Sequence, residues 1–266
     1  MKRSGVYLLI AFMLSICSSS FGQKEKAVLD FGADVMSRYV WRGTQFGGTS
    51  PSLQPSVTLN YKGWELGAWG AYSLGGNNAG QEFDLYLGYT FAKDLFSLTL
   101  TDYYFPTEGE DYNYFEFNND LTGHVLEGSF RFNGNDNIPF ALMVAVNFWG
   151  ADAVKLGNHP NAADFNQKTG LQYSTYTELS YSHKMANDVT LDAFLGVNLT
   201  KPAEAKTSTG FNGESGYYGS KAGVVNLGVT LSKEVALNEK FSLPVSASVI
   251  TNPIDEKIYF VFGFSF

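Results

Sequence analysis

Apolar residues alternate with small or polar residues along most of this chain. The last nine residues, IYFVFGFSF, place on one side Ile258, Phe260, Phe262, Phe264 and Phe266. A period of two is the period of a β-strand, because successive side chains point to opposite faces. In a soluble sheet this terminal strand would be a long apolar edge that invites aggregation. As the closing strand of a transmembrane barrel, it turns the apolar row toward lipid and pairs its edge with the first strand.

The same alternation predicts twelve strands, most of them roughly eight to eleven residues long, which is enough for a tilted strand to cross a bilayer. Their expected ranges are 28–42, 52–62, 64–74, 82–92, 95–104, 114–132 (crossing at 123–132), 140–149, 171–184, 189–200, 221–236, 241–251 and 258–266. An even number of strands returns both chain ends to the same side of the membrane. We therefore expect an all-β fold, a transmembrane antiparallel up-and-down barrel of twelve strands.

The connections between these ranges divide into two classes. Those after the even-numbered strands are short, at 62–63, 92–94, 133–137, 185–188 and 237–240. Those after odd-numbered strands run longer, notably 150–170 and 201–220. Outer-membrane barrels have tight periplasmic turns and longer outer loops, whereas a soluble sandwich has no reason to keep this asymmetry. The pattern predicts that both termini lie on the periplasmic side.

The N-terminus carries the pattern of a secretion signal. Lys2 and Arg3 precede an apolar run at 6–16, and Ser20 and Gly22 supply the small residues of a cleavage site. The apolar run is too short and too poorly flanked for a spanning helix. We expect this segment to be removed on export.

Two regions follow from this, a signal peptide at 1–22 and an outer-membrane barrel at 23–266. Cys17, the single cysteine of the chain, lies in the signal, so the mature protein has no disulfide and no thiolate metal site. A lipoprotein signal is not expected. The acylated cysteine of such a signal follows a small residue, whereas Cys17 follows Ile16.

Composition and charge narrow the class of protein further. Removing the signal takes away two of the 18 Lys and Arg residues and none of the 26 acidic residues, which leaves a formal charge of about −10. That balance argues against nucleic acid as a partner. The mean hydropathy is −0.11, with no apolar run of 18 residues after the signal, so a helical membrane protein is excluded. Alternating barrel strands give such an average.

In a barrel, the polar rows face the lumen because lipid cannot solvate them. By this parity the charged residues that line the pore are Asp30, Asp34, Arg38, Arg42, Glu65, Asp84, Glu127, Arg131, Glu178, Lys184 and Asp192. Acidic residues outnumber basic ones among them, which favours cations if the pore is open. The two arginines of the first strand, above its two aspartates, form either an ion-selective constriction or an ion-pair ladder that fills a narrow barrel.

Catalytic and metal-binding patterns are weak. Ser182 adjoins His183, but neighbours on a strand point to opposite faces, and neither His124 nor His159 has a partner recognisable in the sequence. We therefore expect no enzymatic activity.

An acidic cluster in the third long loop, at Glu108, Glu110 and Asp111, lacks the spacing of a calcium loop and is interpreted as solvated. The tryptophans at 41, 64, 69 and 149 are typical of interfacial girdles, with a sugar path as the alternative. The sequence predicts no cofactor and no metal.

One segment resembles a known family. Residues 34–57 read DVMSRYVWRGTQFGGTSPSLQPSV and contain Ser37, Tyr39, Trp41, Arg42 and Gly43, followed by Pro51, Gln54 and Pro55. This is similar to the opening of the TorF-type porin family of Gram-negative bacteria. Further similarities are WELGAWGAYS at 64–73, EFDLYLGYTF at 82–91 and YYFP at 103–106. The resemblance implies passive passage of small solutes, and the strand ending at Phe266 resembles the signal read by the barrel assembly machinery.

The functional hypothesis is thus a porin-like channel of the Gram-negative outer membrane, for diffusion of small hydrophilic or ionic solutes with a weak cation preference. Its expected partners are outer-membrane lipid, small solutes and the barrel assembly machinery. The alternatives are a barrel hydrolase and a plugged structural or adhesive barrel that acts through its long loops.

Overall fold

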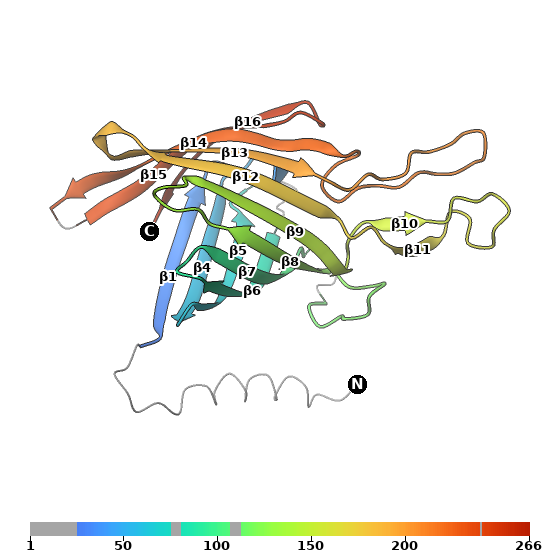
Figure 1. The fold of residues 1–266 in the computed structure, drawn as a ribbon, viewed down its shortest axis with the longest axis horizontal. Coiled ribbons are helices and arrows are strands. Elements are labelled where there is room, and N and C mark those ends of the chain that lie inside the picture. Colours follow the sequence, from blue (N-terminus) through green and yellow to red (C-terminus); the bar gives the residue numbers. More distant parts are fainter. Residues whose placement is uncertain (1–25, 76–80, 107–112, 240) are drawn as a thin grey trace.

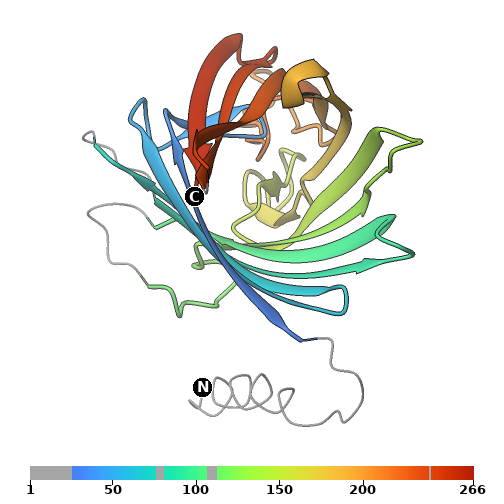
Figure 2. The same ribbon diagram turned by 90° about the vertical axis from the view of Figure 1, so that its left-hand side faces the viewer.

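The computed structural model describes residues 26–75, 81–106, 113–239 and 241–266, and in them twelve strands form one closed antiparallel barrel (Figures 1 and 2). The strands are β1 (Val28–Met36), β4 (Ser52–Tyr61), β5 (Trp64–Ser73), β6 (Gln81–Phe91), β7 (Phe96–Tyr104), β8 (His124–Phe132), β9 (Phe140–Gly150), β12 (Thr175–Lys184), β13 (Val189–Asn198), β14 (Gly223–Asn238), β15 (Phe241–Asn252) and β16 (Lys257–Ser265). Successive strands pair in chain order, and β1 closes the ring on β16. The predicted fold class and strand number are confirmed.

The seam between β1 and β16 is short. Three residue pairs join the two strands, from Asp34 opposite Ser265 to Met36 opposite Gly263, whereas nine pairs join β1 to β4. Just beyond β1, Ser37 continues the seam, because its backbone amide donates to the Phe262 carbonyl oxygen at 2.7 Å. The Phe262 amide in turn donates to the Ser37 hydroxyl at 2.9 Å.

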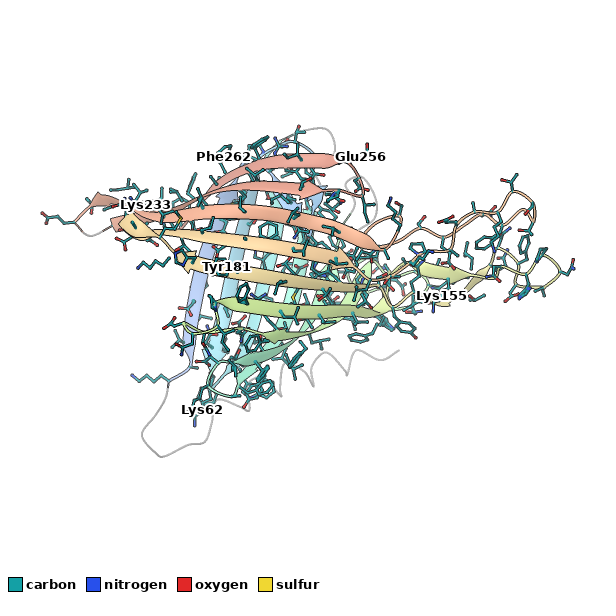
Figure 3. All side chains as sticks on the ribbon, turned by 45° about the horizontal axis from the view of Figure 1, so that its top comes forward. Lys62, Lys155, Tyr181, Lys233, Glu256 and Phe262 are labelled. Carbon is teal, nitrogen blue, oxygen red and sulfur yellow. The ribbon has the colours of Figure 1, made fainter. Side chains whose placement is uncertain are left out.

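The two faces of the wall differ as the alternation predicts. On β16, Phe260 and Phe262 are 54% and 59% exposed on the outside, whereas Tyr259 and Val261 are 7% and 4% exposed (Figure 3). The register places Val261 opposite Ser248, which is opposite Thr230, so these residues share the inner face. An apolar outer row and a polar inner row suit a barrel whose outside is covered by hydrocarbon.

The two rows of β14 allow a direct test of lipid contact. Val229 lies on the outer row and is 43% exposed, while its neighbour Thr230 faces inward and shares a hydrogen bond with Ser248. We expect Val229→Arg to lower the free energy of unfolding in lipid vesicles by about 2–4 kcal/mol. The matched change Thr230→Arg should lower it by about 1 kcal/mol, because only one hydrogen bond is lost. Equal effects in urea titrations would contradict the assignment of the faces.

Short turns and long connections gather at opposite ends of the barrel (Figure 1). The turn end carries the connections 62–63, 92–95, 133–139, 185–188 and 239–240. The loop end carries the connections 37–51, 74–80, 105–123, 151–174, 199–222 and 253–256. The predicted asymmetry is confirmed for the longest connections, although the connection 253–256 of the loop end has only four residues and the connection 74–80 is no longer than the turn 133–139.

The prediction of a first strand over 28–42 was wrong at its end. β1 stops at Met36, and β2 (Tyr39–Trp41) and β3 (Thr44–Phe46) form a separate two-stranded hairpin. The turn between them is Arg42-Gly43, with φ of 47° and 77°. Two positive φ values in a two-residue turn are the mark of a type I′ hairpin, which reverses the chain sharply. The alternation continues through β2, and it therefore gave no sign of the break.

A second hairpin lies in the connection between β9 and β12. It consists of β10 (Val154–Leu156) and β11 (Lys168–Leu171), so the strand expected over 171–184 begins at Thr175. No helix within the described ranges is long and apolar enough to cross a membrane. The predicted signal peptide at 1–22, with Cys17, and the acidic cluster at 108–111 lie outside the described residues.

Candidate functional site

The β2–β3 hairpin leaves the barrel wall and enters the lumen near the loop end. Its Tyr39 ring lies 5.4 Å from the Trp69 ring of β5, and its Trp41 ring lies 5.3 Å from the Tyr103 ring of β7. Both partners sit on inward rows, since the register places Trp69 and Tyr103 on either side of Asp84. The hairpin therefore packs against the inner face of the wall.

The tip of the hairpin reaches the other side of the barrel. Asn252 at the end of β15 donates a hydrogen bond to the Gly43 carbonyl oxygen at 3.2 Å. A β-carbon on Gly43 would overlap the backbone carbonyl of Val225 in β14. Because the hairpin touches strands on both sides of the ring, it lies across the lumen, and we call residues 39–46 the lumen plug.

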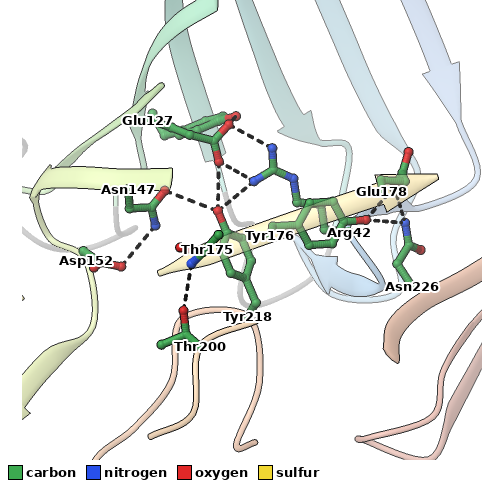
Figure 4. A network of polar contacts seen from close by, with 11 residues as sticks. Arg42, Glu127, Asn147, Asp152, Thr175, Tyr176, Glu178, Thr200, Tyr218 and Asn226 are labelled. Carbon is green, nitrogen blue, oxygen red and sulfur yellow. Dashed lines mark hydrogen bonds and ion pairs between the residues drawn. The ribbon is translucent and has the colours of Figure 1, made fainter. Parts of the chain in front are cut away.

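An ion pair holds the tip of the lumen plug to β8. The two terminal nitrogens of Arg42 donate to the two oxygens of Glu127, with Nη2 at 2.8 Å from Oε1 (Figure 4). The Arg42 side chain is 9% exposed and the Glu127 side chain 2% exposed. Bidentate arginine–carboxylate pairs fix orientation as well as charge. This pair joins the plug to the wall through two charges that are both removed from water.

Hydroxyl groups complete the hydrogen bonding of Glu127. Tyr103 donates to Oε1 at 3.0 Å, and Tyr218 donates to Oε2 at 2.8 Å. The Tyr218 oxygen also accepts a hydrogen bond from Nη1 of Arg42 at 2.7 Å. The carboxylate thus has four donors, which offset the loss of its hydration.

Aromatic rings surround the Arg42 guanidinium. Its Cζ lies 4.4 Å from the Trp41 ring centroid, 4.6 Å from the Tyr176 centroid and 5.3 Å from the Tyr218 centroid. A cation over aromatic faces gains electrostatic attraction that rises when water is excluded. The cage recognises the charge and planarity of an arginine, so a lysine would not replace it fully.

Tyr218 belongs to the connection 199–222, so a connection of the loop end also secures the plug. Its ring is 4% exposed. Burial raises the pKa of the Tyr218 hydroxyl well above its ordinary value, by more than the Arg42 guanidinium lowers it. The hydroxyl therefore stays protonated and remains a donor to Glu127. Beyond it, Asn147 lies 3.2 Å from the same hydroxyl and donates to Asp152 at 3.1 Å.

A second group of polar side chains lies beside the cage on β12 and β14. The Tyr176 hydroxyl donates to Glu178 (Figure 4). The Asn226 side-chain amide donates both to the Tyr176 oxygen and to Glu178, each at 3.1 Å. The Tyr176 ring is therefore fixed beneath the guanidinium. The two groups together link β8, β12 and β14 through hydrogen-bonded side chains around the tip of the plug.

A cavity of about 320 Å³ lies against the plug. Its lining is mainly aromatic, with Trp41, Phe46, Phe105 and Tyr217 around Arg42. Phe46 and Phe105 are stacked with ring centroids 5.7 Å apart. Aromatic walls with few polar groups are common in small-molecule sites.

The two longest connections clasp each other through Glu214. Its Oε1 accepts from the Leu156 amide and its Oε2 from the Ala203 amide, both at 2.9 Å. The Gln172 side chain adds a donor to the Ser215 carbonyl oxygen at 3.0 Å. The connections 151–174 and 199–222 therefore form one body, which projects beyond the barrel in Figure 1.

Removing this clasp should loosen the projecting loops without disturbing the wall. We expect Glu214→Ala to speed hydrogen exchange of the Leu156 and Ala203 amides at least tenfold, because hydrogen bonds to a charged acceptor are worth about 1.5–3 kcal/mol. Glu204→Ala is the matched control, since Glu204 is exposed in the same connection. Unchanged exchange in the Glu214 variant, measured by mass spectrometry, would show that the clasp does not hold the loops together.

Most of the charged residues predicted to line the pore lie on the inner face of the barrel wall. Register places eight of them on the polar inner rows of the wall, namely Asp30, Asp34, Glu65, Asp84, Glu127, Arg131, Glu178 and Asp192. Lys184 ends β12 at the turn end and pairs with Asp188 at 3.3 Å. That they line an open path for solutes stays a prediction.

The two arginines assigned to the first strand need correction. Neither belongs to β1, because the chain turns inward after Met36. Arg38 donates to Gln45 within the loop-end connection at 3.2 Å, and Arg42 occupies the turn of the plug. They therefore do not form a ladder above the β1 aspartates.

One residue missed from the inner row is Glu82, the next inward position to Asp84 on β6. Strand parity would have found it. A charged residue of the outer row was missed as well: Asp102 of β7, whose register partners are Leu85 and Leu126. It lies 2.8 Å from Nδ1 of His124, while Nε2 of His124 lies 2.7 Å from the Tyr114 carbonyl oxygen. His124 is completely buried, and both ring nitrogens have structural partners. No group of three His, Cys, Asp or Glu residues suited to a metal occurs among the described residues.

Known proteins resemble the chain at two levels. Residues 25–201 match a protein family described as "Bacterial protein of unknown function (Gcw_chp)". No curated protein matches the sequence. Among solved structures, the β-domain of the Bordetella autotransporter BrkA is similar over 89% of this chain and 97% of that chain, with 14% sequence identity and a TM-score of 0.33. At that level of similarity the match adds nothing to the barrel topology described above.

Proposed function

The chain belongs to the Gcw_chp family of bacterial proteins, and for this member we propose a gated channel of the Gram-negative outer membrane in which the lumen plug is the gate. When the plug leaves its seat, small hydrophilic or ionic solutes pass by diffusion. The observation that carries the proposal is the bidentate Arg42–Glu127 pair, which joins a short inserted hairpin to the wall.

The setting in an outer membrane is supported by the apolar outer rows and by the separation of turns from loops. The resemblance to the TorF-type porin family supports it further. The motif that carries that resemblance includes Tyr39, Trp41, Arg42 and Gly43, all of which belong to the plug. Ser37, the first residue of the motif, is bonded to β16 at the base of the plug.

The contacts that hold the lumen plug favour a movable gate over a permanently closed barrel. The plug consists of two strands of three residues each, too short to be stable alone. Its tip is held by a buried ion pair, whose attraction is largely offset by desolvation. When the hairpin leaves, both charges regain water. The free energies of the seated and released states are therefore close enough for a stimulus to shift the balance.

The charges that remain in the lumen predict its selectivity. Arg42 and Glu127 neutralise each other. The predicted lining residues left over are acidic at Asp30, Asp34, Glu65, Asp84, Glu178 and Asp192, and basic at Arg38, Arg131 and Lys184. We propose a weak preference for cations on this basis. Reversal potentials in a salt gradient measure it, and an anion preference would contradict it.

The experiment that tests the gate compares two proteins in planar lipid bilayers. One is the wild type, and the other carries a Gly-Ser segment of equal length in place of residues 39–46. We expect rare, small openings from the wild type and a steady, larger conductance from the variant. A silent variant that is folded by circular dichroism would instead favour the plugged structural barrel, whose long loops bind a partner.

We also propose that the protein is not an enzyme. Both nitrogens of His124 are engaged by Asp102 and by the Tyr114 backbone, and the ring has no exposed surface. The histidine is thus placed to fasten the 105–123 connection to the wall. Hydrolysis of phospholipid by the wild type in detergent micelles would contradict this assignment.

A further inference from the structure

Two carboxylates lie side by side on β6 beneath the plug. Glu82 and Asp84 occupy successive inward positions, which are about 6.6 Å apart along a strand. They are only 2% and 6% exposed. Buried carboxylates of this kind normally have a cation or several hydrogen-bond donors as partners.

The described residues give them few partners. Neither oxygen of Glu82 has a hydrogen bond, and Oδ1 of Asp84 has none. Among the described residues no Lys or Arg forms an ion pair with either carboxylate: Arg42 pairs with Glu127, Lys168 with Asp120 and Lys184 with Asp188. Arg38 donates through Nη1 to Gln45, and its Nε has no partner. If both groups carried a negative charge in a space closed to water, the absence of a counter-charge would be strongly unfavourable.

The surroundings of the pair are rich in oxygen and aromatic rings. The Tyr39 phenol of the plug lies next to the Glu82 carboxylate, outside ordinary hydrogen-bond geometry. The Tyr39 ring packs on Trp69, and Trp69 is the register partner of Asp84. The carboxylates therefore face the space between β6 and the hairpin.

We propose that Glu82 and Asp84 bind a divalent cation, with Ca²⁺ preferred over Mg²⁺. Two carboxylates match the charge of one such ion, and carboxylate and phenol oxygens with water suit the irregular shell that Ca²⁺ accepts. Mg²⁺ is disfavoured because it needs near-ideal octahedral geometry. The site stands whether or not the plug opens, but a bound ion next to Tyr39 would also hold the plug against β6.

Terbium luminescence tests the site on the full chain, refolded in detergent after treatment with EDTA. Tb³⁺ replaces Ca²⁺ on oxygen ligands and is sensitised by nearby aromatic rings, here Trp69 and Tyr39. We expect a saturable signal that Ca²⁺ displaces at concentrations at least tenfold lower than Mg²⁺ does. The double variant Glu82→Gln/Asp84→Asn should bind at least tenfold more weakly. Asp192→Asn, which removes one inward carboxylate from β13, should leave binding unchanged.

Thermal unfolding provides a second readout with near-isosteric single variants. Ca²⁺ should raise the Tm of the wild type and leave the Tm of Glu82→Gln and of Asp84→Asn nearly unchanged. The proposal is overturned by a wild type without a saturable signal at millimolar Tb³⁺, or by a double variant that binds as the wild type does. It is equally overturned if Ca²⁺ has no effect on the wild-type Tm while lower pH raises it, since the carboxyl groups then hold protons.

Discussion

Arg42→Ala is expected to turn a mostly closed barrel into a conducting one. The substitution leaves the Glu127 carboxylate, 2% exposed, without its cation while Tyr103 and Tyr218 still enclose it. Removing one partner of a buried ion pair costs about 3–5 kcal/mol. That energy can be avoided if the hairpin leaves and water reaches Glu127. The ratio of seated to released plug should therefore fall by roughly 100-fold to 1,000-fold or more.

Single-channel recording measures this as the fraction of time spent open. The matched control is Arg131→Ala, which removes an inward arginine from β8 but not from the plug. Exchange of the charges in Arg42→Glu/Glu127→Arg should restore part of the closed state, because the pair is rebuilt with its direction reversed. An Arg42→Ala channel that stays closed as often as the wild type would show that the ion pair is not what holds the plug.

Gly43→Ala is expected to unseat the plug without any change of charge. At φ of 77° an L-residue is strained by about 1–2 kcal/mol, and the added β-carbon would overlap the Val225 carbonyl group. Backbone atoms of a barrel strand cannot move aside as a flexible side chain can. The hairpin must withdraw from β14, and the hydrogen bond from Asn252 to the Gly43 oxygen is then lost.

Gly48→Ala is a closely matched control for Gly43→Ala. It also has a positive φ, 69°, but a β-carbon there would meet nothing within 4 Å. Gly48→Ala should therefore show the backbone strain alone and conduct as the wild type does. Gly43→Ala should conduct as the Arg42 variant does, while the barrel keeps its β-sheet circular dichroism. Equal behaviour of the two glycine variants would mean that strain, and not the seat on β14, determines the closed state.

The wall of the barrel could be predicted from the sequence because one periodicity governs every strand. Lipid outside and polar side chains inside impose the same alternation on β4 as on β14, so each strand is recognisable by itself. The lumen plug obeys the alternation too, and for that reason 39–41 was merged with the first strand. The positive φ values of Arg42 and Gly43 mark the turn, but an Arg-Gly pair is a weak hairpin signal beside Asn-Gly.

The contacts that secure the plug could not be predicted from the alternation of apolar and polar residues. Arg42 and Glu127 are 85 residues apart, and Arg42 and Tyr218 are 176 apart. Their meeting depends on the curvature of the closed ring and on the fold of the outer loop, which local patterns do not encode. Strand parity, by contrast, contains enough information to place Glu82 beside Asp84 on the inner face.

The position of Ser37 at the seam has a consequence for biogenesis. The plug begins immediately after this residue, yet the groups that receive it, Glu127, Tyr218 and Val225, all follow it in the chain. Its base is bonded to Phe262, 225 residues downstream, in the strand that closes the ring on β1. We therefore expect the lumen plug, although synthesised early, to reach its position late in assembly, after the strands and loop that contact it have folded.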